Sequence, residues 1–163
     1  MSSPGLKQYR LSSFLRRSVP AFLLLLLISS HTYAANEFDL REFQGKVVVL
    51  DFWASWCVPC RRSFPWMNSM QEKYADQGLV IIGVNLDVVD ADAQAFLRET
   101  PADFRIISDP DGALAREYDV IAMPTSYIFD RNGDLVIRHL GFKVRRQEEY
   151  EALLAETLNK EME

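Results

Sequence analysis

One stretch of sequence, residues 47–62, constrains the fold more than any other part of the chain. It begins with the apolar, β-branched run Val47 to Trp53, passes through Cys57-Val58-Pro59-Cys60, and continues into a charged segment typical of a helix. A strand that leads into a helix in this way places two thiols at the first turn of that helix. Free backbone N–H groups and the helix dipole stabilise a thiolate there, so the pattern predicts a reactive cysteine.

The chain contains two cysteines, and both belong to this motif. A disulfide between residues so close in sequence closes a short loop and gains little stability from chain entropy. A zinc site needs about four ligands, and the histidines of the chain are His31 and His139. We therefore interpret Cys57 and Cys60 as a redox pair rather than a structural disulfide or part of a metal site. We expect no metal and no cofactor beyond this dithiol.

The first 35 residues differ in composition from the rest of the chain. Four basic residues between Lys7 and Arg17 precede an apolar run over residues 19–28, and small residues follow. This order is that of a secretory signal peptide, and about ten apolar residues are fewer than the roughly 20 of a membrane-spanning helix. We expect a signal peptide at 1–35, with a retained N-terminal membrane anchor as the alternative, and one domain at 36–163.

The predicted domain is acidic. All 23 acidic residues follow position 35, whereas four of the 18 basic residues precede it, so the domain carries a net charge of about −9. Binding to nucleic acid depends on a basic surface. We therefore expect no nucleic-acid partner.

The order of the predicted elements indicates an α/β fold. The strands of the hairpin flank Asn132-Gly133, a dipeptide typical of a tight turn. The whole order predicts a mixed sheet between layers of helices. Apolar runs predict strands over 46–53, 79–86, 104–108, 125–129 and 135–140, and helical patterns predict helices over 57–76, 91–99, 113–118 and 145–160.

At Trp56-Cys57-Val58-Pro59-Cys60 the chain resembles the thioredoxin superfamily, and within it the exported TlpA/ResA-like thiol–disulfide oxidoreductases. The resemblance covers about residues 37–160. It implies a thioredoxin fold, with a mixed central sheet flanked by helices and a TlpA-like inserted helix and strand. Its further marks are Pro65, Met123-Pro124-Thr125, the hairpin at 128–133 and the inserted segment at 88–108.

The resemblance also implies a role for each residue of the site. Cys57, nearest to the helix start and to solvent, would be the attacking thiolate, and Cys60 the resolving thiol. Asp51 is a carboxylate in an apolar strand; it would accept the proton of Cys60, with a pKa raised by burial. The alternative for Asp51 is a structural side chain, either hydrogen-bonded or turned outwards. The expected substrate-binding residues are Trp56, Val58, Pro59, Met123 and Pro124, with Pro124 in the cis form rather than in an ordinary trans turn.

Several other residues are assigned structural roles. Trp53 is predicted to lie in the core, and Trp66 and His139 are interpreted as packing residues. The acidic residues after the second strand are expected to form a solvated loop that caps the next helix through Asp90; the alternative is that they face the site and influence the choice of partner. They are Asp87, Asp90 and Asp92.

We therefore predict a periplasmic thiol–disulfide oxidoreductase that reduces protein disulfides. The resemblance implies partner proteins with thiols or disulfides, in the maturation of cytochrome c or of copper-site proteins, and a membrane dithiol as electron donor. Among the proteins that the chain resembles, a proline just before the second cysteine goes with reductases, so the resemblance at Val58-Pro59 favours a reductase. The alternatives are a thiol oxidant of secreted proteins, a Cu(I)-binding chaperone that uses the dithiol, and a peroxidase, which would need a threonine where Ala54 stands.

Overall fold

The computed structural model describes residues 38–160. The signal peptide or anchor expected at 1–35 lies outside this range. In the part of the chain described here, no helix is both long enough and apolar enough to cross a membrane.

Five strands form one mixed sheet in the order β3-β2-β1-β4-β5. β1 occupies the centre and all of its residues are buried, as its unbroken apolar pattern predicts. β1, β2 and β3 run parallel, β4 runs antiparallel to β1, and β5 pairs antiparallel with β4. The strands are β1 (Val47–Trp53), β2 (Leu79–Asn85), β3 (Arg105–Ser108), β4 (Thr125–Phe129) and β5 (Leu135–Leu140).

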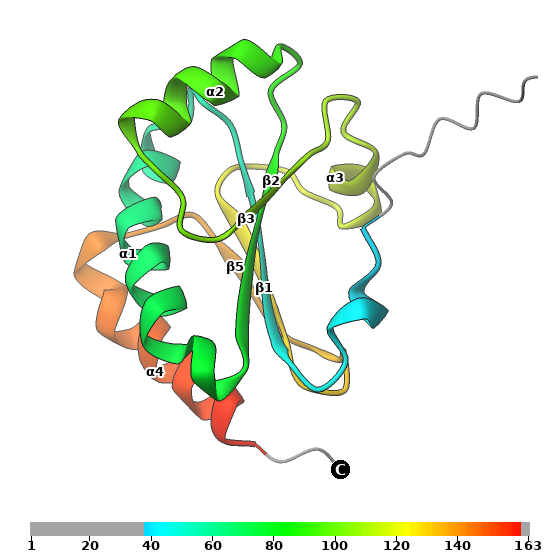
Figure 1. The fold of residues 1–163 in the computed structure, drawn as a ribbon, viewed down its shortest axis with the longest axis vertical. Helices are drawn as coiled ribbons and strands as arrows, with labels where there is room; N and C mark the ends of the chain where they lie inside the picture. Colours follow the sequence, from blue (N-terminus) through cyan, green and yellow to red (C-terminus); the bar gives the residue numbers. More distant parts are fainter. Residues whose placement is uncertain (1–37, 161–163) are drawn as a thin grey trace, which may run out of the picture. The chain divides into compact units, whose positions relative to one another are not determined.

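Helices cover both faces of this sheet, as the order of elements predicts (Figure 1). One face packs against α1 (Val58–Tyr74), α2 (Asp90–Glu99) and α4 (Gln147–Asn159). The other face packs against α3 (Ala113–Glu117) and the 3-10 helix η2 (Leu40–Phe43). Two further 3-10 turns are η3 (Ala75–Gln77) and η4 (Val144–Arg146).

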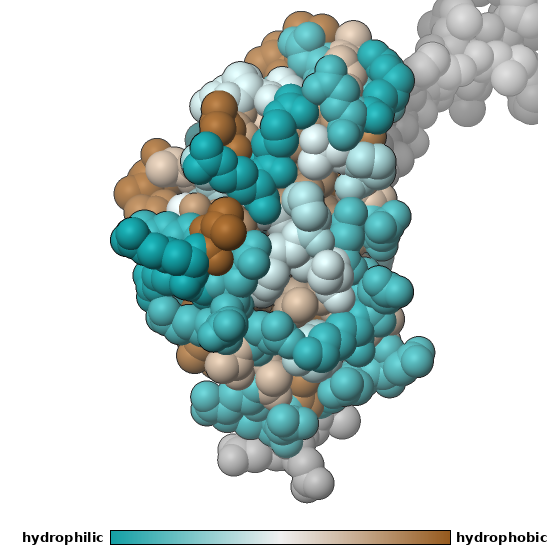
Figure 2. Space-filling view, turned by 90° about the vertical axis from the view of Figure 1, so that its left-hand side faces the viewer, coloured by the Kyte–Doolittle hydropathy of each residue, from teal (hydrophilic) through white to brown (hydrophobic). Residues whose placement is uncertain are grey.

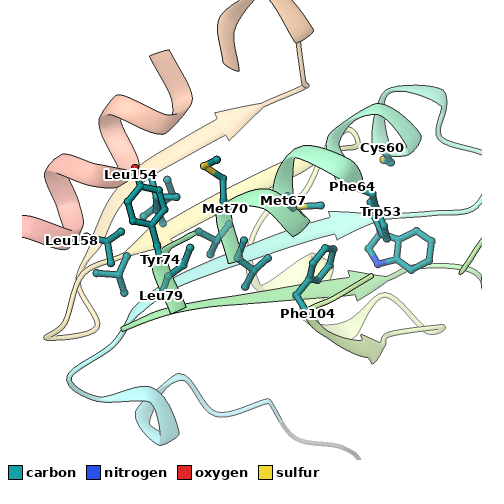
Figure 3. Packing of buried hydrophobic residues seen from close by; sticks show 14 of the residues in the cluster. Trp53, Cys60, Phe64, Met67, Met70, Tyr74, Leu79, Phe104, Leu154 and Leu158 are labelled. Atoms are coloured by element: carbon teal, nitrogen blue, oxygen red, sulfur yellow. The ribbon is translucent and has the colours of Figure 1, made fainter. Parts of the chain in front are cut away.

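Alternate residues of β1 enter two separate cores. Val49 and Trp53 belong to the cluster beneath α1 and α4, whereas Leu50 and Phe52 belong to the opposite cluster. Figure 3 shows the first cluster, which extends from Trp53 and Cys60 at one end of the sheet to Leu154 and Leu158 near the other. Because side chains alternate along a strand, Asp51 shares the face of Val49 and Trp53.

At the end of the sheet remote from the cysteines, the side chain of Arg131 joins three segments of the chain. The guanidinium of Arg131 donates hydrogen bonds to the carbonyl oxygens of Gly45, Gln77 and Leu158, each at 2.9 Å. Gly45 lies just before β1, Gln77 is the last residue of η3, and Leu158 lies in the last turn of α4. Arg131 therefore connects three segments that are far apart in sequence.

The start of α2 differs from the prediction. The helix begins at Asp90, its N-cap residue is Val89, and no side chain caps it. Asp90 and Asp92 lie in the first turn, where their negative charges interact favourably with the helix dipole without forming a cap.

Figure 2 shows the face formed by α1 and α4, on which apolar residues occur as separate small patches among hydrophilic ones.

Candidate active site

The two cysteines lie at the start of α1 and are joined by a disulfide. Their Cα atoms are 5.3 Å apart. Cys57 is the N-cap residue of α1, and its Sγ accepts a hydrogen bond from the backbone N–H of Cys60 at 3.2 Å. In the reduced protein a Cys57 thiolate at this position would accept the same N–H and lie at the positive end of the helix dipole. Pro59 in the first turn removes an N–H that has no partner within the helix.

The disulfide is sheltered, but the residues around it are exposed. Trp56 is 71% exposed and Val58 is 61% exposed, and Pro59 is also exposed. Cys57 is 3% exposed and Cys60 is fully buried. The order of exposure within the pair matches the prediction, but Cys57 is much less accessible than expected, because it packs into the core cluster that contains Cys60.

The loop before β4 reaches the same end of the sheet. Thr125 pairs with Phe52 across β1 and β4, so the preceding Pro124 lies beside the segment that leads from β1 to Cys57. The Met123–Pro124 peptide bond is cis, which confirms the predicted conformation. Pro124 is buried, and Met123 packs against the core cluster that contains Cys57 and Cys60.

Asp51 is buried beneath this end of α1. It is 1% exposed, and its Oδ1 accepts a hydrogen bond from the Ser126 hydroxyl at 2.5 Å. Its Oδ2 has no hydrogen-bond partner among residues 38–160. Burial raises the pKa of Asp51 from 3.8 to about 7, although the hydrogen bond from Ser126 opposes this increase. A carboxyl group with this pKa can take up or release a proton near neutral pH.

Asp87 supports the loop before Cys57, a role that the sequence reading missed. It was expected in a solvated loop, but it is 5% exposed. Its carboxylate accepts hydrogen bonds from the backbone N–H and the hydroxyl of Ser55, both at 2.9 Å, and from the side-chain amide of Asn85 at 2.8 Å. The position of Asp87, just beyond β2 and next to the end of β1, was the available signal. Asp90 and Asp92 are exposed, as expected.

A small cavity adjoins Asp51 on the face covered by α1 and α4. It has a volume of about 40 Å³, and Ser63, Trp66, Ser126 and His139 are among the residues that line it. Trp66 and His139 pack against Tyr150 of α4, with ring centroids 6.0 Å and 4.2 Å from the tyrosine ring. Their predicted packing roles are therefore confirmed. Trp53 is fully buried, also as predicted.

The arginine that follows the motif is engaged elsewhere. Arg61 forms an ion pair with Glu99 at 3.0 Å and lies over the ring of Phe96, both on α2. Within residues 38–160, no group of three or more histidine, cysteine or acidic side chains is arranged to hold a metal ion. The site therefore combines a dithiol at a helix start, a buried carboxyl and an exposed apolar rim.

The chain is similar to known proteins in sequence. Residues 15–138 match the AhpC/TSA family. The thiol-disulfide oxidoreductase ResA of Bacillus thuringiensis subsp. konkukian is 34% identical over 116 residues, which cover 71% of this chain and 67% of that protein. The thioredoxin-like protein YneN of Bacillus subtilis is 34% identical over 124 residues, which cover 74% of this chain and 72% of that protein.

Solved structures show the same relationship. The crystal structure of a thiol:disulfide interchange protein DsbE from Chlorobium tepidum matches with a TM-score of 0.72 and 48% identity, over 74% of this chain and 85% of that one. StoA from Bacillus subtilis matches with a TM-score of 0.59 and 25% identity, over 68% and 84% of the two chains. These similarities confirm the predicted resemblance, the thioredoxin fold and the class of activity. The chain thus belongs to the AhpC/TSA family and is a thiol–disulfide oxidoreductase of the thioredoxin type, with its Cys-x-x-Cys motif at Cys57 and Cys60.

Proposed function

We propose that the protein is an exported reductase of protein disulfides. The Cys57 thiolate attacks one sulfur of a substrate disulfide, and the first substrate cysteine leaves as a thiolate. Cys60 then transfers its proton to Asp51 and attacks Cys57 Sγ, which releases the second substrate cysteine. The two electrons pass from the enzyme dithiol to the substrate, and the enzyme ends with the Cys57–Cys60 disulfide.

The observation that carries this proposal is the buried carboxyl of Asp51. A resolving thiol must lose its proton before it attacks, and Cys60 is fully buried, so its proton needs an acceptor inside the protein. Asp51 lies on the same face of the sheet and belongs to the wall of the cavity that reaches Ser63, one turn after Cys60. Since its pKa is raised to about 7 by burial, it is a suitable proton acceptor at neutral pH.

The charges near the dithiol favour reduction of substrates. A strong disulfide oxidant is one whose reduced form is stabilised, usually through a strongly stabilised thiolate. Here the cation closest to the motif in sequence, Arg61, is paired with Glu99, and the charge beneath the site is the carboxylate of Asp51. A negative charge at that place opposes a second negative charge on the cysteines, so the disulfide form is favoured and the dithiol gives up its electrons readily.

The rim of the site suits an extended polypeptide. Trp56 and Val58 are exposed beside the disulfide, and Pro59 is exposed in the first turn. Met123 and the cis Pro124 lie at the same end of the sheet. We propose that a substrate segment packs on the exposed side chains of Trp56, Val58 and Pro59 and pairs with the backbone before Pro124, as a strand adds to a sheet edge.

The proposed location and partners rest on the sequence. The expected signal peptide at 1–35 supports a periplasmic protein, and a retained anchor there would hold it at the membrane. The resemblance to TlpA/ResA-like proteins supports partners in cytochrome c or copper-site maturation, with a membrane dithiol that returns the enzyme to its reduced form. The similar proteins are named as a thiol-disulfide oxidoreductase ResA and a thiol:disulfide interchange protein DsbE, which supports partner proteins with thiols or disulfides.

The reduction potential tests the direction of the reaction. The purified protein is equilibrated with a dithiol buffer of known potential, and the redox state is followed through tryptophan fluorescence. A reductase is expected to have a potential near or below about −270 mV, the value for thioredoxin. A potential near −120 mV, typical of a strong oxidant, would contradict the proposal and identify a disulfide donor.

A trapping experiment tests the partner class. The Cys60→Ser variant retains the attacking thiol but cannot resolve the mixed disulfide, so it should accumulate bound to its substrates through Cys57. Cys57→Ser is the matched control. We expect the trapped proteins to be exported, with cysteine pairs at haem or copper sites. If the control captures the same proteins, Cys57 is not the attacking residue.

A further inference from the structure

Three polar side chains from neighbouring strands form one row across the sheet. Asp51 of β1 pairs with Ser126 of β4, and Ser126 pairs with His139 of β5. Residues directly opposite each other on antiparallel strands project to the same face. The row therefore lies on the face covered by α1 and α4, and it extends from the buried centre of the sheet to its edge strand.

The cavity runs along this row. Asp51, Ser126 and His139 all line it, and apolar side chains form most of the remaining wall. Four buried side-chain atoms among residues 38–160 lack a hydrogen-bond partner, and three of them belong to residues of this cavity: Asp51 Oδ2, Trp66 Nε1 and His139 Nε2. Buried polar atoms are normally satisfied by protein or by ordered water. A cavity of about 40 Å³ has room for water, and these three atoms supply the polar contacts that buried water needs.

We propose that His139 exchanges protons with Asp51 through water in this cavity and so connects the buried carboxyl to solvent at the edge of the sheet. This inference rests on the proposed role of Asp51. The proposal gives His139 a role in proton transfer, in addition to its packing against Tyr150. His139 acts through Asp51 and does not touch the reacting sulfurs.

The protonation states of the two groups suit this exchange. Burial lowers the pKa of His139, and the nearby positive charges of Arg146 and Lys143 lower it further, whereas Glu149 opposes them. The imidazole is therefore neutral at neutral pH and presents one donor and one acceptor nitrogen. The other groups that face it are the Tyr150 ring from α4 and, along the row, the Ser126 hydroxyl and the Asp51 carboxyl.

The proton balance is simplest to follow while an external thiol reduces the enzyme. The thiolate attacks Cys57 Sγ, the Cys57–Cys60 bond breaks, and its electron pair passes to Cys60 Sγ. Protonated Asp51 gives its proton to Cys60. The Asp51 carboxylate then recovers a proton from cavity water. His139 donates a proton to that water from one ring nitrogen while its other ring nitrogen accepts a proton from solvent, so the imidazole stays neutral overall. In the oxidation of the enzyme by a substrate disulfide, the same proton moves in the opposite direction.

The test is the rate of reduction of the Cys57–Cys60 disulfide by dithiothreitol, followed by tryptophan fluorescence from about pH 5 to about pH 9. His139→Gln keeps a polar side chain that cannot relay a proton. Ile137→Phe keeps His139 but fills the cavity, because Ile137 lines it from the same strand. Arg138→Gln is the matched control, since the neighbouring residue of β5 projects to the other face.

We expect both His139→Gln and Ile137→Phe to slow reduction about tenfold at neutral pH, which is less than the roughly 10²–10⁴-fold that positioned proton transfer contributes in full. In both variants the rate should also rise with buffer concentration, because buffer molecules replace the lost route. Arg138→Gln should match the parent protein. A purely structural role for His139 would not create a dependence on buffer.

Asp51→Asn separates this inference from the proposed function. If Asp51→Asn is slow while His139→Gln and Ile137→Phe keep the parental rate without buffer dependence, the route through His139 is wrong and the role of Asp51 stands. If Asp51→Asn also keeps the parental rate, the proposed role of Asp51 is itself wrong. Slowing of Arg138→Gln to the same degree would also overturn the inference, because it would show a general effect of β5.

Discussion

Asp51 makes the stability of the oxidised protein depend on pH in a direction that can be derived from its burial. The pKa of Asp51 is about 7 in the folded protein and 3.8 ordinarily. Between these values the folded protein binds a proton that the unfolded chain has released. The free energy of unfolding therefore decreases as pH rises through this window. The contribution is fully present below about pH 4 and is lost above about pH 7.

The size of the effect follows from the same two values. Each pKa unit corresponds to about 1.4 kcal/mol, so ionised Asp51 lowers the free energy of unfolding by roughly 4 kcal/mol at pH 8. Asp51→Asn removes the ionisation and retains an oxygen that accepts the Ser126 hydroxyl. We expect Asp51→Asn to be about as stable as the parent protein near pH 4 and more stable by up to roughly 4 kcal/mol near pH 8.

Urea unfolding of the disulfide-bonded proteins at several pH values, followed by tryptophan fluorescence, measures this difference. Ser126→Ala provides a check in the opposite direction. It removes the hydrogen bond that lowers the pKa of Asp51, so the pH dependence of the parent should extend to higher pH. A stability difference between Asp51→Asn and the parent that stays constant from pH 4 to pH 8 would refute the reasoning.

Three further substitutions test the loop before Cys57, the core packing beside β1 and the exposed rim of the site. Asp87→Ala leaves the Ser55 N–H without its acceptor, so we expect a loss of about 1–3 kcal/mol in urea unfolding, and equal stability would contradict its supporting role. Gly83→Ala would place a Cβ 2.8 Å from Ile106 Cδ1 in the core; a loss of about 1–3 kcal/mol is expected, and a neutral result would show that the neighbours repack. Trp56→Ala should lower kcat/KM for insulin reduction by about tenfold and affect oxidised glutathione less, whereas equal losses with both would exclude a docking role.

Much of the fold was predictable because its signals are local. β4 and β5 occupy the predicted residues, and β1 and β2 each differ from prediction by one residue at one end. Apolar runs, the Asn132-Gly133 turn and the helical spacing of α4 are properties of short segments. The positions of Cys57 and Cys60 at a helix start followed from the same local pattern, and the burial of Asp51 followed from its place in an apolar strand.

The remaining features depend on contacts between distant segments. Asp87 is 32 residues from Ser55 in sequence, and only the parallel pairing of β1 with β2 brings them together. The sequence groups Asp87 with Asp90 and Asp92, which are exposed in the structure, and its residue type alone does not distinguish it from them. The row of Asp51, Ser126 and His139 depends on the register of three strands, which no single segment contains. The burial of Cys57 could not be foreseen from its own segment, because its packing partners come from other elements.

The three carbonyls held by Arg131 have a consequence for local opening of the native state. Fraying of the last turn of α4 must break the hydrogen bond from Arg131 to Leu158. Movement of the segment before β1, or of η3, away from Arg131 must break the hydrogen bonds to Gly45 and Gln77. These segments are therefore expected to open together as one cooperative unit, with similar protection of their amides from hydrogen exchange. The dithiol lies at the opposite end of β1, so the active-site loops can loosen upon reduction while this unit remains closed. The contacts of Arg131 thus stabilise the end of the sheet opposite the dithiol.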